Sequence, residues 1–439
     1  MNSRSVARVI KSSVLAVTLL VMNTAAAQAS STNFDPSAGS YTVNTSTLTL
    51  TGPSTNITGK DVGGIAVFSF HNVSIPAGAT ITASGSRPLE IAASGGFDLA
   101  GTIDGSGTDA AVFTPGPNPG GPGGGQGGAN DSSSGSGPGG GSPGSTDSDG
   151  GGGGGFGGAG SAGYADGGTG GAGGPAYGDL NTALQGGSGG AGGSTGSDAA
   201  GGGGGGGGIE LSGSSLTIAT TGSVLANGGE GALAGDGASG GGSGGGIILH
   251  ADSIDVAGTV SADGGQGGTG DCCGDGGGGG GGRIAYQYLT LTAAGSPTVG
   301  GGTSGTSDGS AHSGDSPGAN GVITMAKAGS GATRGATSVK HRSAKLHAKV
   351  KPDGYPARYQ FKYGTSRALG KKAPASPASA GSGSGSVSVS ASLRGLKPGR
   401  TYHYRIVVYS LGFKILGAAK TFKTPRSRPR VVTPPPFTG

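Results

Sequence analysis

The chain has 439 residues, of which 108 are glycine; tryptophan is absent and aromatic residues make up 5%. This shortage of large apolar side chains excludes one conventional hydrophobic core along the whole chain. The net charge of +5 conceals two opposed parts: residues 30–325 contain three basic residues against 22 acids, whereas residues 326–439 contain 22 basic residues against one acid. Such parts bind different partners or each other, so intramolecular docking of the acidic and basic parts is one expectation.

The first 29 residues have the pattern of a signal peptide. Arg4, Arg8 and Lys11 precede an apolar run at 14–22, and small residues at 25–29 offer a cleavage site. We expect residues 1–29 to be removed on export, so the protein would be extracellular or at the cell surface; an uncleaved N-terminal anchor is the alternative. No other stretch approaches the ~18 consecutive apolar residues of a membrane-spanning helix, so none is expected in the mature chain.

Residues 30–116 are a predicted N-terminal β-repeat region. Short alternating runs rich in β-branched residues occur at 41–50, 64–70 and 97–103, with turn residues between them. The periodicity of an amphipathic helix is absent. The region is therefore predicted to be all-β.

Residues 117–208 are dominated by glycine, with serine, alanine, aspartate and proline between the glycines. Glycine loses the most backbone entropy on ordering, and there is little side-chain burial to offset that loss. We expect this low-complexity excursion to be disordered. A packed bundle of extended polyglycine-type strands is the alternative, but the sequence lacks the strict three-residue period that would specify it.

Residues 209–325 contain a repeat. Strands beginning at Ile209, Ile247 and Ile284 are 38 and 37 residues apart, and each is followed by a second short strand and a glycine-rich excursion. An earlier copy covers 91–105, and 321–325 is a predicted last strand. One unit cannot bury its apolar face alone, so neighbours must stack. A parallel β-helix with glycine-rich loops leaving one corner fits this pattern best.

The three repeats, with residues 70–81 and 101–105, resemble the glycine-rich, pectin-lyase-like β-helix regions of bacterial surface proteins. The resemblance covers about half of the chain that follows the signal peptide. It implies an architecture rather than an activity, because a fold does not fix its chemistry.

After a predicted linker at 326–335, residues 336–424 contain alternating strands separated by turns. The segment Leu396-Lys-Pro-Gly-Arg-Thr-Tyr402 and the strand at 357–363 resemble a fibronectin type III domain. The resemblance implies a β-sandwich in which the hydroxyl of Tyr402 bonds back to the backbone at a strand corner. No tryptophan occupies the family's early core position. Residues 425–439 are a basic, proline-rich tail.

Basic side chains at the outward positions of these strands are the candidate binding residues. A charge of about +21 in one small domain exceeds what solubility requires and attracts polyanions. The candidates in the strands and the tail are Lys345, Lys349, Lys351, Arg358, Lys362, Arg405, Lys423, Arg426, Arg428 and Arg430. The expected partners are an anionic cell-wall polymer, an acidic polysaccharide or lipid headgroups, bound mainly through charge.

No catalytic, cofactor-binding or metal-binding residue is predicted. The histidines lack metal-ligand spacing and are expected at the surface; they are His71, His250, His312, His341, His347 and His403. No cofactor is expected, although acids in the loops at 147–150 and 270–276 allow weak Ca²⁺ association. Cys272 and Cys273 are adjacent, which disfavours an ordinary structural disulfide between them.

The predicted fold class is all-β: a parallel β-helix-like repeat body with long glycine-rich loops, followed by a fibronectin type III-like β-sandwich. The favoured function is a secreted or cell-surface structural or adhesive protein without enzymatic activity. The alternative is an extracellular carbohydrate-active enzyme, a polysaccharide lyase or hydrolase. The scarcity of basic residues in the body argues against this alternative, because an acidic surface repels a polyuronate.

Overall fold

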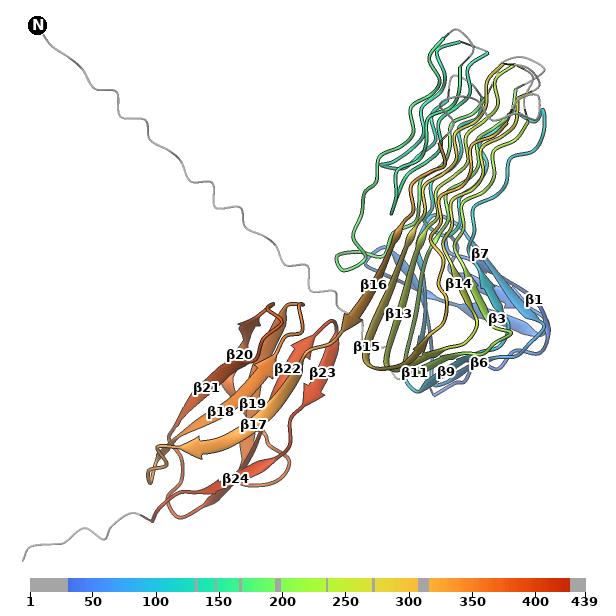
Figure 1. The fold of residues 1–439 in the computed structure, drawn as a ribbon. Helices are drawn as coiled ribbons and strands as arrows, with labels where there is room; N and C mark the ends of the chain where they lie inside the picture. Colours follow the sequence, from blue (N-terminus) through green and yellow to red (C-terminus); the bar gives the residue numbers. More distant parts are fainter. Residues whose placement is uncertain are drawn as a thin grey trace, which may run out of the picture.

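The computed structural model describes residues 31–130, 133–146, 148–165, 168–193, 199–233, 236–270, 273–306 and 316–426. Every regular element in these ranges is a β-strand. Figure 1 shows two parts, which we call the body (31–329) and the sandwich (330–426). The predicted signal peptide, Cys272 and the end of the tail lie outside the described residues. Within the described ranges, no helix is long and apolar enough to cross a membrane.

The body contains a seven-stranded sheet with the order β14-β12-β10-β7-β1-β2-β3. Strands β14 to β1 of this order pair in parallel, whereas β1, β2 and β3 pair antiparallel. The bounds are β1 Gly39–Asn44, β2 Thr49–Gly52, β3 Thr55–Thr58, β7 Ala79–Ser84, β10 Thr102–Asp104, β12 Ser223–Leu225 and β14 Thr259–Ser261.

The body also contains a nine-stranded sheet with the order β16-β15-β13-β11-β8-β5-β4, in which β9 pairs with β11 and β6 beside this path. Its pairs are parallel except for β4 with β5. The bounds are β4 Lys60–Val62, β5 Ile65–Phe70, β6 Val73–Ile75, β8 Leu89–Ala93, β9 Gly96–Leu99, β11 Gly208–Ile218, β13 Gly246–Val256, β15 Arg283–Ala294 and β16 Val322–Lys327. Both sheets are open, because neither strand order returns to its first strand.

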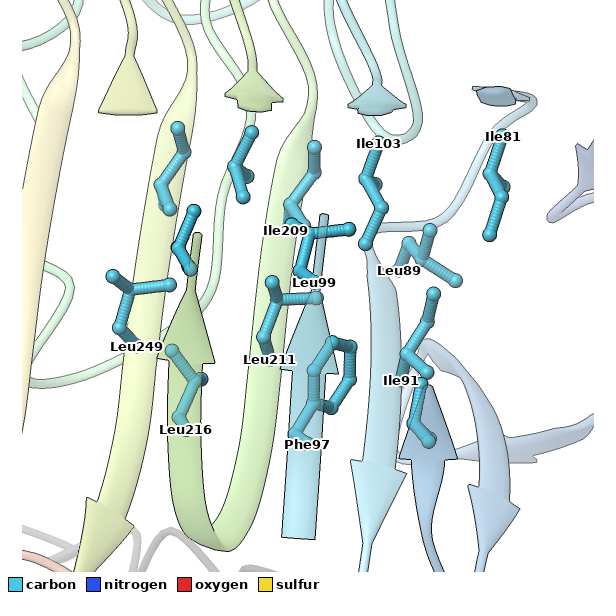
Figure 2. Close-up of a cluster of buried hydrophobic side chains, with 14 of the residues drawn as sticks. Ile81, Leu89, Ile91, Phe97, Leu99, Ile103, Ile209, Leu211, Leu216 and Leu249 are labelled. Carbon is cyan, nitrogen blue, oxygen red and sulfur yellow. The ribbon is translucent and has the colours of Figure 1, made fainter. Parts of the chain in front are cut away.

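Apolar side chains from successive strands stack in rows inside the body. Ile209 pairs with Leu89 on one side and with Ile247 on the other, and Ile247 pairs in turn with Ile284. The predicted spacings of 38 and 37 residues are therefore single steps from strand to strand. Figure 2 shows side chains from these rows meeting in one buried cluster, which includes Phe97. A one-residue shift in pairing would turn the apolar side chains outward, so the alternation fixes the register.

The glycine-rich segments lie side by side as extended chains beyond the two sheets (Figure 1), and we call their described parts within 105–207, 226–245, 262–282 and 299–321 the glycine bundle. Their backbones hydrogen-bond with a period of three residues. In the central run 150–155, the amides of Gly151 and Gly154 donate to the segment 238–241, both at 2.9 Å. The amides that precede these two donate to 161–164, and the amides that follow donate to 139–142, at 2.7–2.9 Å. Three residues per turn is the repeat of a polyproline II-type helix.

Crowding explains why the central run is glycine at every position. A Cβ atom added at any residue of 150–155 would lie 1.8–2.6 Å from a backbone atom of a neighbouring segment. None of these glycines has a left-handed φ, so the requirement comes from the close approach of backbones and not from an unusual dihedral angle. The bonds between segments satisfy donors and acceptors that an isolated polyproline II chain leaves to water.

For the described parts of 117–208, this packing contradicts the expectation of disorder. Hydrogen bonds between backbones, rather than side-chain burial, offset the entropy that the glycines lose. The sequence lacks a three-residue glycine period for a geometric reason. A central segment has neighbouring backbones on every side, so it needs glycine at every position and not only at every third one. An outer segment shows the period: Ala226, Gly229 and Ala232 are buried, and Glu230 is exposed.

The sandwich packs a three-stranded sheet (β17-β18-β21) on a five-stranded sheet (β20-β19-β22-β23, with β24 beside β22), and all pairs are antiparallel. Leu346 from the first sheet and Phe361, Tyr404 and Ile406 from the second are fully buried between them. The bounds are β17 Ser330–Thr337, β18 Ser343–Lys351, β19 Ala357–Gly364, β20 Lys371–Gly381, β21 Val387–Arg394, β22 Thr401–Ser410, β23 Phe413–Leu416 and β24 Lys420–Lys423.

The body continues almost directly into the sandwich. Only two residues separate β16 from β17, so most of the predicted linker at 326–335 is strand. The rings of His250 on β13 and Phe413 on β23 stack, with centroids 4.3 Å apart and planes at 14°. Near this stack, the Gly329 amide donates to Ser410 Oγ at 3.2 Å. An aromatic contact and a hydrogen bond therefore join the two parts.

Replacing a central glycine should destabilise the body. The Cβ of a Gly153→Ala variant would lie 2.1 Å from the carbonyl oxygen of Gly278, whereas that of Gly300→Ala would lie 3.5 Å from Asp263 Oδ1, an ordinary contact. We expect Gly153→Ala to lower the free energy of unfolding by about 2 kcal/mol or more, in the range of overpacking. Gly300→Ala should change it by less than about 1 kcal/mol. Calorimetric melting of both variants checks this, and equal effects would show that crowding does not impose glycine in the run.

Candidate functional site

The basic residues predicted to bind polyanions lie on both outer faces of the sandwich. Lys345, Lys349 and Lys351 are exposed at alternate positions of β18, opposite the core residue Leu346 and its neighbours. They therefore lie on the outer face of the three-stranded sheet. Lys351 forms an ion pair with Asp353 at 2.5 Å.

Four other predicted residues lie on the outer face of the five-stranded sheet. Arg358 and Lys362 alternate on β19 with core residues such as Phe361, and Arg405 lies between core residues of β22. Lys423 on β24 pairs with Thr401, and Thr401 is one of the alternate residues of β22 that face away from the core. The predicted set is thus divided between two opposite faces, and no single surface contains all of it.

The tail contributes one described candidate. Arg426 lies against the turn at Gly399, whose amide donates to the Pro425 carbonyl at 3.1 Å. Arg428 and Arg430 lie outside the described residues.

Two cations on the five-stranded sheet are additional to the predicted set. Lys372 on β20 is the direct partner of Lys362, and Lys414 on β23 is the partner of Tyr409. Neither strand was predicted, because β20 contains two prolines and little alternation, and β23 has four residues. Prolines are tolerated at the edge of a sheet, where no partner needs the missing amide. In the sequence of β20, only the adjacent lysines Lys371 and Lys372 could have indicated a place in a cationic surface.

Neighbouring cations on this face perturb Lys362. The charge of Lys414, partial desolvation and the charge of Lys372 lower the pKa of the Lys362 ammonium. Nε of Arg405 is buried and has no hydrogen-bond partner among the described residues. The only acid after residue 325 is Asp353, which is paired with Lys351 of the other sheet. No carboxylate of the sandwich therefore neutralises this group of cations.

Tyr402 is buried and bonds to the backbone of the preceding turn. Its hydroxyl accepts a hydrogen bond from the Lys397 amide at 2.8 Å, and its ring stacks on Phe422 with centroids 5.4 Å apart. This is the type of contact that the resemblance to fibronectin type III domains implies for this tyrosine.

A pair of buried glutamates in the body was also missed. Glu90 on β8 and Glu210 on β11 are direct partners in parallel register, and each is 8% exposed. They lie on the outer face of the nine-stranded sheet, because core residues flank them along both strands. In the next strand Glu210 is paired with Ile248, which packs under Leu180 and Leu184. The short apolar segment around these two leucines thus covers this end of the sheet.

Burial raises the pKa of both glutamates, and the closeness of the two carboxyl groups adds to the effect on Glu210. Burial, together with the charge of Glu90, raises the pKa of Glu210 to about 8. Burial also raises the pKa of Glu90, against the effect of the hydrogen bond that Ser212 Oγ donates to Glu90 Oε1 at 3.2 Å. A carboxyl with a raised pKa is a feature of acid catalysts, but both carboxyl groups of this pair are buried.

Other candidate groups are used within the fold. His250, expected at the surface, is mostly buried by Phe413 and bonds through Nδ1 to Gln287 Oε1 at 3.0 Å; burial lowers its pKa, against the effects of Gln287 and the charge of Asp252. Cys273 is disulfide-bonded, and Cys272 lies outside the described residues. Among the described residues, no group of three or more His, Cys, Asp or Glu is placed to bind a metal.

A cavity of about 470 Å³ opens at the end of the body, beside Asp263, Asn320 and Ile323. The carboxylate of Asp263 accepts hydrogen bonds from Thr298 Oγ1 at 2.7 Å and from the Gly300 amide at 2.6 Å. Asp263 is the one charged residue among those that line the cavity, and these bonds hold its carboxylate in place.

No protein-family model and no curated protein matches the chain. Among solved structures, the sensor domain of the anti-sigma factor RsgI4 from Pseudobacteroides cellulosolvens is similar over 23% of this chain and 96% of its own, at 23% identity and a TM-score of 0.20. A fibronectin type III domain derived from the human KIAA0970 protein matches 25% of this chain and 82% of its own, at 18% identity and a TM-score of 0.15. The chitinase ChiW from Paenibacillus sp. str. FPU-7, a cell-surface-expressed multi-modular enzyme, matches 49% of this chain and 21% of its own, at 10% identity and a TM-score of 0.14. TM-scores this low carry no argument about function.

The buried glutamates should make stability fall with rising pH. The unfolded chain releases the Glu210 proton near pH 4.5, whereas the folded chain holds it to about pH 8, so stability is full below pH 4.5 and declines between these values. We expect Glu210→Gln to melt at least about 2 °C above the wild type at pH 8 and close to it at pH 4.5. Glu230→Gln, at an exposed position, is the control and should follow the wild type. Parallel melting curves for all three proteins would refute the assignment.

Proposed function

We propose that this protein is a secreted or cell-surface structural or adhesive protein whose basic sandwich binds anionic surface polymers. The observation that carries the proposal is the excess of 22 basic residues over one acid from residue 326 onward. Exposed strand positions on both sheets of the sandwich hold part of this charge. A field of this sign and density attracts a cell-wall polymer, an acidic polysaccharide or lipid headgroups.

Export rests on the sequence of the first 29 residues, which has the basic, apolar and small-residue regions of a cleaved signal peptide. A polymer outside the cell is the partner that an exported basic domain would meet. The proposal therefore places the protein at the cell surface or in the surrounding medium.

We propose that the body is a β-helix-type spacer. Parallel, in-register stacking of Ile209, Ile247 and Ile284 supports this architecture, since stacked repeats are stabilised by their neighbours. The glycine bundle adds a backbone-bonded extension to the spacer. A spacer built in this way would hold the sandwich away from its point of attachment.

We propose that the sandwich is a fibronectin type III-like module. The two-sheet arrangement and the bond between Tyr402 and the Lys397 amide support this identification.

We propose no catalytic role and no cofactor. Among the described residues, Glu90 and Glu210 are the nearest approach to a catalytic carboxyl pair, and both are buried, next to Ile248, which packs with Leu180 and Leu184. A polysaccharide chain would need an open groove at these carboxyls.

The body is acidic and the sandwich is basic, so the body competes with the anionic polymer for the sandwich. The ion pairs Arg87–Asp61 and Lys351–Asp353 each lie within one part, whereas His250 and Phe413 join the two parts. We propose that the acidic body weakens polymer binding through its field, without direct pairing.

The whole exported chain should bind immobilised anionic polymers in a salt-dependent manner. Raising the ionic strength from about 0.01 M to about 1 M shortens the electrostatic screening length from about 30 Å to about 3 Å. The protein should therefore be retained strongly at about 0.01 M salt and not at all at about 1 M salt. Retention on columns carrying polygalacturonate, polyphosphate or neutral dextran measures this. Failure to bind either anionic column at low salt would overturn the proposed function.

A further inference from the structure

One row of the five-stranded sheet brings three cations side by side. Lys362 on β19 is the direct partner of Lys372 on β20 and of Arg405 on β22. Adjacent strands are about 4.8 Å apart, so the three side chains leave the sheet within about 10 Å of one another. They share the outer face, because core residues flank Lys362 and Arg405 along their strands.

Lys414 on β23 adds a fourth charge beside this row, because it is the partner of Tyr409, which lies four residues along β22 from Arg405. Lys414 is exposed, and its charge is the largest cause of the lowered pKa of Lys362, so the two ammonium groups lie close together. Between them the surface is uncharged and closed: Val407 on β22 is fully buried, and Gln360 on β19 donates to the Pro374 and Ala375 carbonyls at 2.9 and 2.8 Å. The cations therefore surround a packed, uncharged floor.

Arg405 is held in this row without a partner for its charge. The residue is partly buried, and its Nε is buried with no hydrogen bond. Buried donors are nearly always bonded in folded proteins, so an unpaired guanidinium nitrogen indicates a missing acceptor. Packing fixes the side chain in advance, which reduces the entropy lost when an anion binds.

The outer face of the three-stranded sheet provides a comparison within the same domain. Its rows contain single cations flanked by small or hydroxyl-bearing residues: Lys349 lies between Ala332 and Ser388, and Lys345 between Thr337 and Ser392. Like charges directly opposite each other across strands are destabilising. The row on the five-stranded sheet therefore costs folding stability, and departures of this kind are expected at functional positions.

We propose that Lys372, Lys362 and Arg405, together with Lys414 beside their row, form a defined site for the oxyanions of a linear anionic polymer, which crosses the strands of the five-stranded sheet along this row. The inference deepens the proposed function, on which it rests, by assigning binding to one face of the sandwich. Phosphate and carboxylate groups share the required chemistry, since both accept hydrogen bonds from ammonium and guanidinium groups.

The test compares two triple variants of the full exported chain with equal changes in charge. The row variant carries Lys362→Gln, Lys372→Gln and Arg405→Gln, whose side chains remain long and polar. The matched control carries Lys345→Gln, Lys349→Gln and Arg394→Gln on the three-stranded sheet, where Arg394 is the partner of Ser343. Affinity for polyphosphate and for polygalacturonate is measured over a series of salt concentrations, and melting of each variant is recorded.

The row variant should lose at least about tenfold in affinity, and its plot of log affinity against log salt should flatten by about one for each cation lost. The control should lose less than about threefold, and the row variant should melt no lower than the wild type, because its like-charge repulsion is gone. A larger loss for polyphosphate than for polygalacturonate would identify phosphate as the ligand group, and the reverse would identify carboxylate.

Two results separate the site from the function. Equal losses in both variants, or a larger loss in the control, would overturn the site and leave charge-based binding by the whole sandwich in place. Absence of binding by the wild type to both polymers would overturn the proposed function itself.

Discussion

Direct contact between backbones is the constraint on which the glycine bundle depends. In the run 150–155 each amide donates to a neighbouring segment, and successive amides turn to three different neighbours. This arrangement is possible only where no Cβ intervenes, since an added methyl would meet backbone atoms at 1.8–2.6 Å. Hydrogen bonds thus take the place that side-chain burial has in an ordinary core, and a chain with few large residues forms a packed structure.

The bundle and the sheets support each other through shared strands. The segments of the bundle enter and leave the long strands β11, β13 and β15, whose register is fixed by the stacked apolar rows. Phe156 lies within the central part of the bundle and packs on Tyr177 and beneath the guanidinium of Arg283, at the start of β15. A single aromatic cluster therefore ties the bundle to the nine-stranded sheet, and the same sheet contacts the sandwich through His250.

Much of the architecture could be predicted, and the failures have physical causes. The strand starts at Ile209, Ile247 and Ile284 pair as the repeat spacing indicates, because apolar alternation acts locally. Order in the glycine-rich segment was missed, because its stabilising bonds join one backbone segment to another, near or distant in the chain, and involve no side chain that would leave a pattern in the sequence. The strands β20 and β23 were missed because of prolines and short length, and Lys372 and Lys414 were missed with them.

The sequence by itself determined the all-β class, the repeat and the segregation of charge into an acidic body and a basic sandwich, since each follows from composition or from short-range alternation. Only the tertiary structure decided which charges meet. Lys362, Lys372 and Arg405 become neighbours through antiparallel register, and Glu90 and Glu210 through parallel register across 120 residues of chain. Register between strands depends on the whole network of packing and backbone bonds, and no window of the sequence contains it.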